Sequence, residues 1–262
     1  MAMHKMKQIQ IATPSIGHEE YEAVKDTLQS GWLTQGPKVK AFEDSFTDYH
    51  QLDHALAVTS CTTGLQLILA GLGIGPDDEV VVPAFTWVST ANVVLHAGAT
   101  PVFVDIDLNT FNIDPQKIKN AITPKTKAII AVHLFGLCAD MDAIKNVAGD
   151  IPIIEDAACA VGSKHPAGFA GGLGIAASFS FHPRKTITTG EGGMVSTQSS
   201  VLYKKMDVLR NHGASVSEEQ RHNGPRPYIL PDFDVCGFNF RMTDLQASIG
   251  VEQMKRLGTL IQ

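Results

Sequence analysis

Short apolar runs rich in valine, isoleucine and alanine alternate with helix-like segments along most of this 262-residue chain. Strands that are apolar throughout are buried on both faces, and helices between such strands favour parallel pairing. The pattern therefore predicts a three-layer α/β/α fold with a mostly parallel sheet. The expected strands are 54–59, 79–83, 101–105, 128–133, 152–155, 177–181 and 193–197, and the helices that alternate with them are 63–72, 89–96, 115–121, 141–148, 201–211 and 243–257.

Two more helices are expected before the first strand, at 17–30 and 39–49. The periodicity of the first places Tyr21, Val24 and Leu28 on one apolar face. The polar stretch 215–231 is typical of a long loop rather than a linker, and there is no internal repeat. We therefore expect residues 1–262 to form one large domain.

Composition excludes several classes of function. The net charge of −6 provides no basic field for nucleic acid. No apolar run approaches the ~20 residues that cross a bilayer, and residues 1–10 lack a signal-peptide core, so a cytoplasmic location is expected. None of the four cysteines forms a C-x-x-C pair. His50 and His54 have no third ligand nearby in the sequence, so no metal site is expected.

Four chemically capable residues follow expected strands. Thr62, Trp87, Asp156 and Lys185 lie at or just past the carboxyl ends of these strands. Ligands of open α/β sheets bind beyond this edge. We therefore expect the four side chains to converge on one crevice.

The chemistry of these residues indicates pyridoxal phosphate (PLP). PLP requires a lysine that bonds to its aldehyde, a carboxylate that keeps its ring nitrogen protonated, and an anion site for its phosphate. Lys185 supplies an amine, Asp156 ends an apolar strand, and the hydroxyl-rich turn at Thr62 precedes a helix whose first N–H groups can bind an anion.

Taken singly, each residue also has a structural explanation. Lys185 can be a surface lysine, Asp156 a helix cap, Thr62 an N-cap, and Trp87 part of the core. In an extended strand Glu155 points away from Asp156. His133 and His182 are weaker candidates for acid–base work.

Several ordered motifs together carry a family resemblance. The chain resembles the DegT-type nucleotide-sugar aminotransferases, which are fold type I PLP enzymes of the aspartate aminotransferase superfamily. The matching segments are Gly31-Trp-Leu-Thr-Gln-Gly-Pro37, 73–83, 85–87, 101–107, Glu155-Asp-Ala-Ala158, Ser180-Phe-His-Pro-Arg-Lys185, Thr189-Gly-Glu-Gly-Gly193 and Gly237-Phe-Asn-Phe-Arg-Met-Thr-Asp244.

The resemblance implies amino transfer from an amino acid such as glutamate to a nucleotide-linked keto-sugar. It implies Lys185 as the Schiff-base lysine and proton shuttle, Asp156 on the pyridine nitrogen and Trp87 stacked on the ring. Related sugar dehydratases carry histidine at the lysine position, so Lys185 favours amino transfer.

The resemblance also implies the phosphate contacts and the assembly. Thr62, Thr63 and Ser180 would hold the phosphate, and Asn239 would reach the phosphate of a neighbouring subunit in a homodimer. One departure concerns the cofactor: Cys159 stands where the family often has Gln or His against the phenolic oxygen of PLP, and a thiol is a poor hydrogen-bond partner.

A second departure concerns length. Family members continue into a smaller C-terminal domain that helps to shape the substrate pocket, and this domain is expected to be largely missing here. Three alternatives stay open at this point: an inactive or regulatory member of the same fold, an aminotransferase for a non-sugar cyclic ketone, and an unrelated nucleotide-binding α/β domain.

Overall fold

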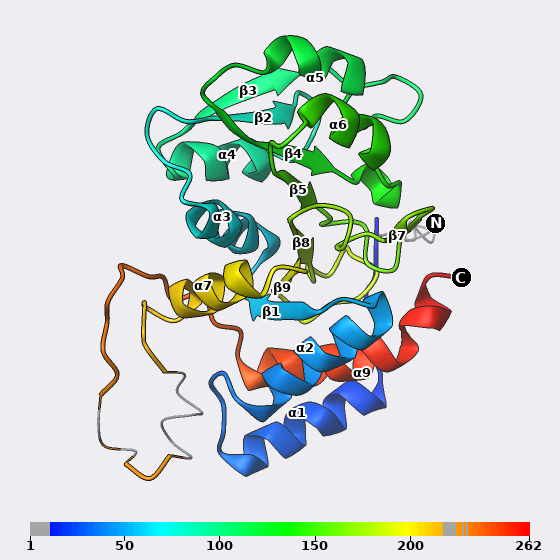
Figure 1. Ribbon diagram of the computed structural model, residues 1–262. Helices are drawn as coiled ribbons and strands as arrows, with labels where there is room; N and C mark the ends of the chain where they lie inside the picture. Colours follow the sequence, from blue (N-terminus) through cyan, green and yellow to red (C-terminus); the bar gives the residue numbers. More distant parts are fainter. Residues whose placement is uncertain (1–10, 217–223, 227, 229) are drawn as a thin grey trace, which may run out of the picture.

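The computed structural model describes residues 11–216, 224–226, 228 and 230–262, and a seven-stranded sheet runs through its centre (Figure 1). The strand order is β1-β9-β8-β5-β4-β2-β3. From β3 to β8 every neighbouring pair is parallel, whereas β9 is antiparallel to both β8 and β1. The predicted mostly parallel sheet is confirmed. Its strands are β1 (His54–Val58), β2 (Glu79–Pro83), β3 (Thr100–Val104), β4 (Thr126–Val132), β5 (Ile153–Asp156), β8 (Ala176–Ser180) and β9 (Gly193–Thr197).

Helices cover both faces of the sheet, as the three-layer prediction requires (Figure 1). One face packs against α3 (Cys61–Leu72), α4 (Ser89–His96) and α7 (Ser200–Arg210). The other packs against α2 (Pro37–His50) and α9 (Asp244–Leu260) at one end, and against α5 (Pro115–Ala121) and α6 (Met141–Ala148) at the other. The remaining elements are α1 (His18–Ser30), the 3₁₀ turn η1 (Leu134–Gly136) and the short hairpin β6 (Lys164–His165) and β7 (Gly168–Phe169), of which the sequence predicted only α1.

Strand β4 shows why uniformly apolar strands suit this architecture. Ala128 and Ile130 pack into the core on the α3 side, whereas Ile129 and Ala131 pack into the core on the α5 and α6 side. All four are fully buried. Because successive side chains of a strand point to opposite faces, both faces must be apolar when both are covered.

Helix α1 buries polar residues and exposes apolar ones, the reverse of what is usual for a surface helix. Its apolar residues Tyr21 and Leu28 are 64% and 55% exposed, whereas Glu20 and Thr27 are buried. Glu20 accepts a hydrogen bond from Gln253 Nε2 at 2.7 Å and pairs with Arg256, both on α9. This polar network fixes the buried face of α1.

Helix α2 carries two buried titratable side chains, Glu43 and His50. His50 Nδ1 donates to the carbonyl of Phe46, and Nε2 accepts from the Gly162 amide at 3.1 Å. Burial lowers the pKa of His50 to about 4. Arg210 of α7 reaches across the sheet edge and donates to Glu43 Oε1 at 2.6 Å; both side chains are buried.

Within the described ranges, no helix combines the length and the apolar character needed to cross a membrane.

Candidate active site

A cavity of about 470 Å³ opens at the carboxyl ends of the strands. Its walls come from segments far apart in the sequence: the first turn of α3 after β1, the β2–α4 connection, the end of β5 and the bend after β8. The topology therefore brings together side chains that follow different strands. Six of the eight predicted site residues line this cavity, namely Thr62, Trp87, Asp156, Cys159, Ser180 and Lys185, and so do the two weaker candidates His133 and His182.

Asp156 is the last residue of β5 and is only 4% exposed. Thr90 Oγ1 donates to its Oδ2 at 2.8 Å, and the Ala158 amide donates to Oδ1 at 3.3 Å. Thr86, which lines the cavity, has its Oγ1 2.9 Å from Thr90 Oγ1. Since Thr90 gives its proton to Asp156, Thr86 donates to Thr90. This hydroxyl chain fixes the orientation of the carboxylate.

The buried thiol of Cys61 completes the surroundings of Asp156. Its Sγ lies 3.7 Å from Asp156 Oδ1 and 3.4 Å from the Ser178 carbonyl. Burial, and then the negative charge of Asp156, raises the pKa of this thiol well above its usual range. Cys61 therefore keeps its proton and acts as a donor. Sequence reasoning missed Thr90 and Cys61, since neither is near Asp156 in the chain.

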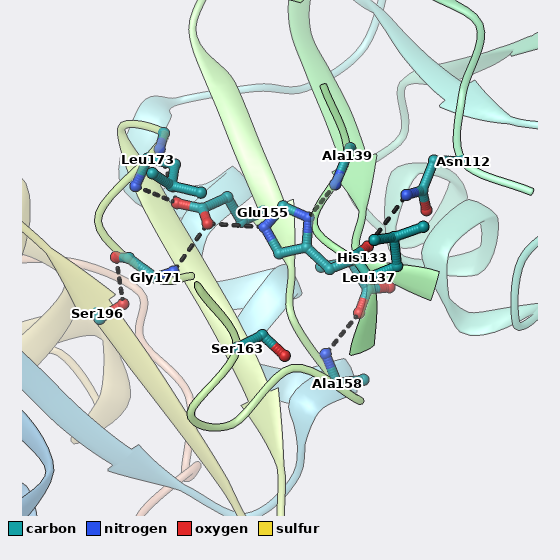
Figure 2. A network of polar contacts seen from close by, with 12 residues as sticks. Asn112, His133, Leu137, Ala139, Glu155, Ala158, Ser163, Gly171, Leu173 and Ser196 are labelled. Carbon is teal, nitrogen blue, oxygen red and sulfur yellow. Dashed lines mark hydrogen bonds and ion pairs between the residues drawn. The ribbon is translucent and has the colours of Figure 1, made fainter. Parts of the chain in front are cut away.

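Asp156 lines the cavity and Glu155 does not, in agreement with the strand alternation that separates them. Glu155 instead forms the centre of a buried network (Figure 2). His133 Nε2 donates to Glu155 Oε2 at 2.8 Å, and His133 Nδ1 accepts from the Ala139 amide at 3.1 Å. Three backbone amides also donate to the carboxylate, those of Gly171, Leu173 and Gly174 at 2.8, 2.8 and 2.6 Å. Both ring nitrogens of His133 are thus occupied, which leaves neither for acid–base work in the cavity.

The start of α3 forms one end of the cavity. The helix begins at Cys61, two residues earlier than predicted, because Ser60 is its N-cap and Ser60 Oγ accepts from the Thr63 amide at 3.1 Å. Thr63 Oγ1 in turn accepts from the Ser60 amide, so the Thr63 hydroxyl belongs to the cap and does not line the cavity. The hydroxyls that line the cavity here are those of Ser60, Thr62 and Ser180.

Gly193 at the start of β9 makes this position of α3 possible. A Cβ added there would lie 2.5 Å from the Ser60 carbonyl carbon and 2.7 Å from the Cys61 nitrogen. The backbones of the helix start and the strand are therefore so close that residue 193 has no room for a side chain. The result is a helix N-terminus that faces the cavity, an arrangement suited to anions.

Lys185 lies on the bend after β8 and is half-buried. Its amide donates to the His182 carbonyl at 2.8 Å, and its Nζ donates to Cys159 Sγ at 3.0 Å. Arg184 and Glu191 also line the cavity, although neither was among the predicted site residues.

Asn239 is exposed and lies outside the cavity. Its backbone forms an isolated bridge with Asn211. The contact that the family resemblance implies for Asn239, with a neighbouring subunit, stays a prediction.

The chemistry of the cavity fits PLP. An amine, a buried carboxylate and a hydroxyl-lined helix N-terminus match the aldehyde, ring nitrogen and phosphate of this cofactor. Trp87 is 75% exposed at the cavity wall, where its indole face is free to stack on a flat ring.

Comparisons with known proteins agree with this fit. The sequence model of the DegT/DnrJ/EryC1/StrS aminotransferase family matches residues 14–262. The spore coat polysaccharide biosynthesis protein SpsC of Bacillus subtilis is 47% identical over 93% of the chain, which spans 63% of SpsC. GDP-perosamine synthase of Caulobacter vibrioides is 43% identical over 97% of the chain, which spans 67% of that protein.

Solved structures resemble the fold over nearly its whole length. The putative sugar aminotransferase Spr1654 of Streptococcus pneumoniae, in its PMP-form, superimposes with a TM-score of 0.89 and 35% identity. The match covers 96% of this chain and 68% of Spr1654, which has also been solved in a PLP-form. The chain thus spans between 63% and 68% of the length of these three proteins, and the PLP-form of Spr1654 supports PLP as the cofactor of the family.

Proposed function

The chain belongs to the DegT/DnrJ/EryC1/StrS aminotransferase family, and from this premise we propose that it is a PLP-dependent aminotransferase. In this proposal the donor is an amino acid, glutamate, and the acceptor is a nucleotide-linked keto-sugar. The observation that carries it is the convergence of Lys185, Asp156 and the α3 N-terminus on one cavity. The relative named GDP-perosamine synthase supports the class of acceptor.

Each site residue has a defined task in the proposed reaction. PLP, when bound, supplies an electron sink for the pair released at the substrate carbon. Lys185 Nζ would hold the cofactor aldehyde and, as a free amine, would move a proton to and from the substrate carbon. Asp156, oriented by Thr90, stabilises the proton on the ring nitrogen through its negative charge. Thr62 and Ser180 bind the phosphate beside the helix N-terminus.

We include a homodimer and a cytoplasmic location in the proposal. Asn239 is exposed outside its own cavity, where it is free to contact a second subunit. The four cysteines are free thiols, which suits a reducing compartment.

The decisive experiment locates the bond to the cofactor. PLP is added to the purified chain, the absorption of the bonded cofactor is recorded, and the bond is reduced with borohydride before peptide mapping. The proposal expects the label on Lys185. A label on a different lysine would refute the assignment.

Turnover and substrate class need a separate assay. Lys185→Ala is expected to lower the rate of amino transfer by at least about 10²–10⁴-fold, the usual contribution of a general acid–base group. Lys25→Ala, on the exposed side of α1, serves as the matched control. Transfer to a keto-sugar without a nucleotide, at the same rate as to its nucleotide-linked form, would contradict the proposed acceptor.

A further inference from the structure

Lys185 and Cys159 form a close pair of nucleophiles. Lys185 Nζ lies 3.0 Å from Cys159 Sγ, although 26 positions separate the two residues in the sequence. The pair results from the sheet topology, because Cys159 follows β5, Lys185 follows β8, and these strands are parallel neighbours. The two neighbouring strands therefore bring the segments that follow them close enough for the nitrogen and the sulfur to be in hydrogen-bond contact.

Cys159 differs from two other thiols in its access to small reagents. It is exposed and lines the open cavity. Cys61 is buried, and burial raises its pKa; burial also raises the pKa of Cys138. Reactive cysteines are accessible and lie near cationic groups, and Cys159 alone of these three meets both conditions. Cys236 is exposed as well but does not line the cavity, which makes it a natural control.

We propose that Cys159 and Lys185 form a reversible covalent sulfur–nitrogen link under oxidation by a hydroperoxide. The peroxide O–O bond breaks, Cys159 becomes a sulfenic acid, and water or an alcohol leaves. The unprotonated Lys185 amine then attacks sulfur. The S–N bond forms, the S–O bond breaks, and hydroxide leaves as water with one proton from nitrogen.

The link is reversible because thiols reduce it. Two external thiols convert it to the original cysteine and lysine and become a disulfide. While it lasts, the link occupies the nitrogen that the proposed function assigns to PLP. Oxidation would thus switch off cofactor binding until a thiol reductant restores the pair. Only this consequence rests on the proposed function; the link itself requires only the pair.

The test compares masses before and after oxidation. The reduced chain, free of cofactor, is treated with hydrogen peroxide at mildly alkaline pH and examined by intact mass and peptide mapping. The expected product is lighter than the reduced chain by two hydrogen atoms, contains one peptide that joins Cys159 to Lys185, and returns to the starting mass with dithiothreitol.

Three variants define the controls. Cys159→Ser and Lys185→Arg are expected to abolish the joined peptide, whereas Cys236→Ser is expected to retain it. Sulfenic or sulfinic acid at Cys159 with Lys185 free would overturn the proposal, as would a joined peptide in Lys185→Arg. A link that forms equally well with and without added PLP would support the link and count against the proposed function.

Discussion

Replacing Glu155 by glutamine tests how much the buried network behind the cavity contributes to stability. The carboxylate has two oxygens, and each accepts two hydrogen bonds from the protein: Oε2 from His133 and Gly171, and Oε1 from Leu173 and Gly174. An amide has one oxygen, so its NH₂ group must face two donors in either orientation. Moving the His133 proton to Nδ1 does not help, since Nδ1 faces the Ala139 amide.

The substitution therefore removes two bonds to a charged acceptor from a fully buried site. Bonds of this kind contribute about 1.5–3 kcal/mol each, so Glu155→Gln is expected to lower the free energy of unfolding by about 3–6 kcal/mol. Reversible urea denaturation followed by circular dichroism measures this loss. Glu22→Gln is the control, because Glu22 pairs with Lys25 on the surface, where solvent screens the charges, and its loss is expected to leave the unfolding midpoint nearly unchanged. A loss below about 1 kcal/mol for Glu155→Gln would refute the claim that both oxygens are needed.

Three other perturbations follow from buried groups and close contacts. The folded pKa of His50 is about 4 and its usual value 6.5, so the unfolded chain binds the extra proton between these values. Stability is then full above pH 6.5 and falls by about 3 kcal/mol as the pH drops to 4, a slope that His50→Gln should flatten in urea titrations across this range. Arg210→Met leaves Glu43 buried without its partner and is expected to cost about 3–5 kcal/mol, of which the additional change Glu43→Gln should recover a part; equal unfolding midpoints for the single and double variants would contradict this. Gly193→Ala places a methyl group against Ser60 and is expected to cost about 1–3 kcal/mol and to weaken PLP binding in a spectroscopic titration, whereas unchanged affinity would show that the start of α3 does not need its present position.

The fold could be predicted because its information is local. The seven apolar runs correspond to β1–β5, β8 and β9, with bounds that agree within one or two residues. A run that is apolar throughout, such as β4, must have helices packed on both faces of its sheet. This requirement is the basis of the three-layer prediction. The hairpin β6–β7 was missed because strands of two residues have no periodicity to recognise.

Only the site residues that lie at the ends of strands could be predicted from the sequence. Thr62, Asp156 and Lys185 were found because each lies at or just past the carboxyl end of a strand, and the parallel topology brings such residues together. Thr90 was missed, since its bond to Asp156 joins positions 66 apart in the sequence. The role of Ser60 as N-cap was readable in principle, because serine just before an apolar helical run is a preferred N-cap residue.

Helix α1 marks the limit of periodicity. The pattern shows which residues share a face, but it does not show which face meets the protein. Here the bonds of Glu20 to α9 decide the orientation, and Tyr21 and Leu28 face outward.

The neighbouring positions of Glu155 and Asp156 in β5 limit which insertions and deletions the protein can tolerate. Glu155 accepts hydrogen bonds in the interior and Asp156 lines the cavity, and the alternation of side chains along one strand is what places these neighbours on opposite sides. A deletion of one codon within this strand would rotate both acids to the wrong sides at once, and no single replacement elsewhere could repair both. Insertions and deletions among descendants of this sequence should therefore occur in the connecting loops and not within the four residues Ile153–Asp156.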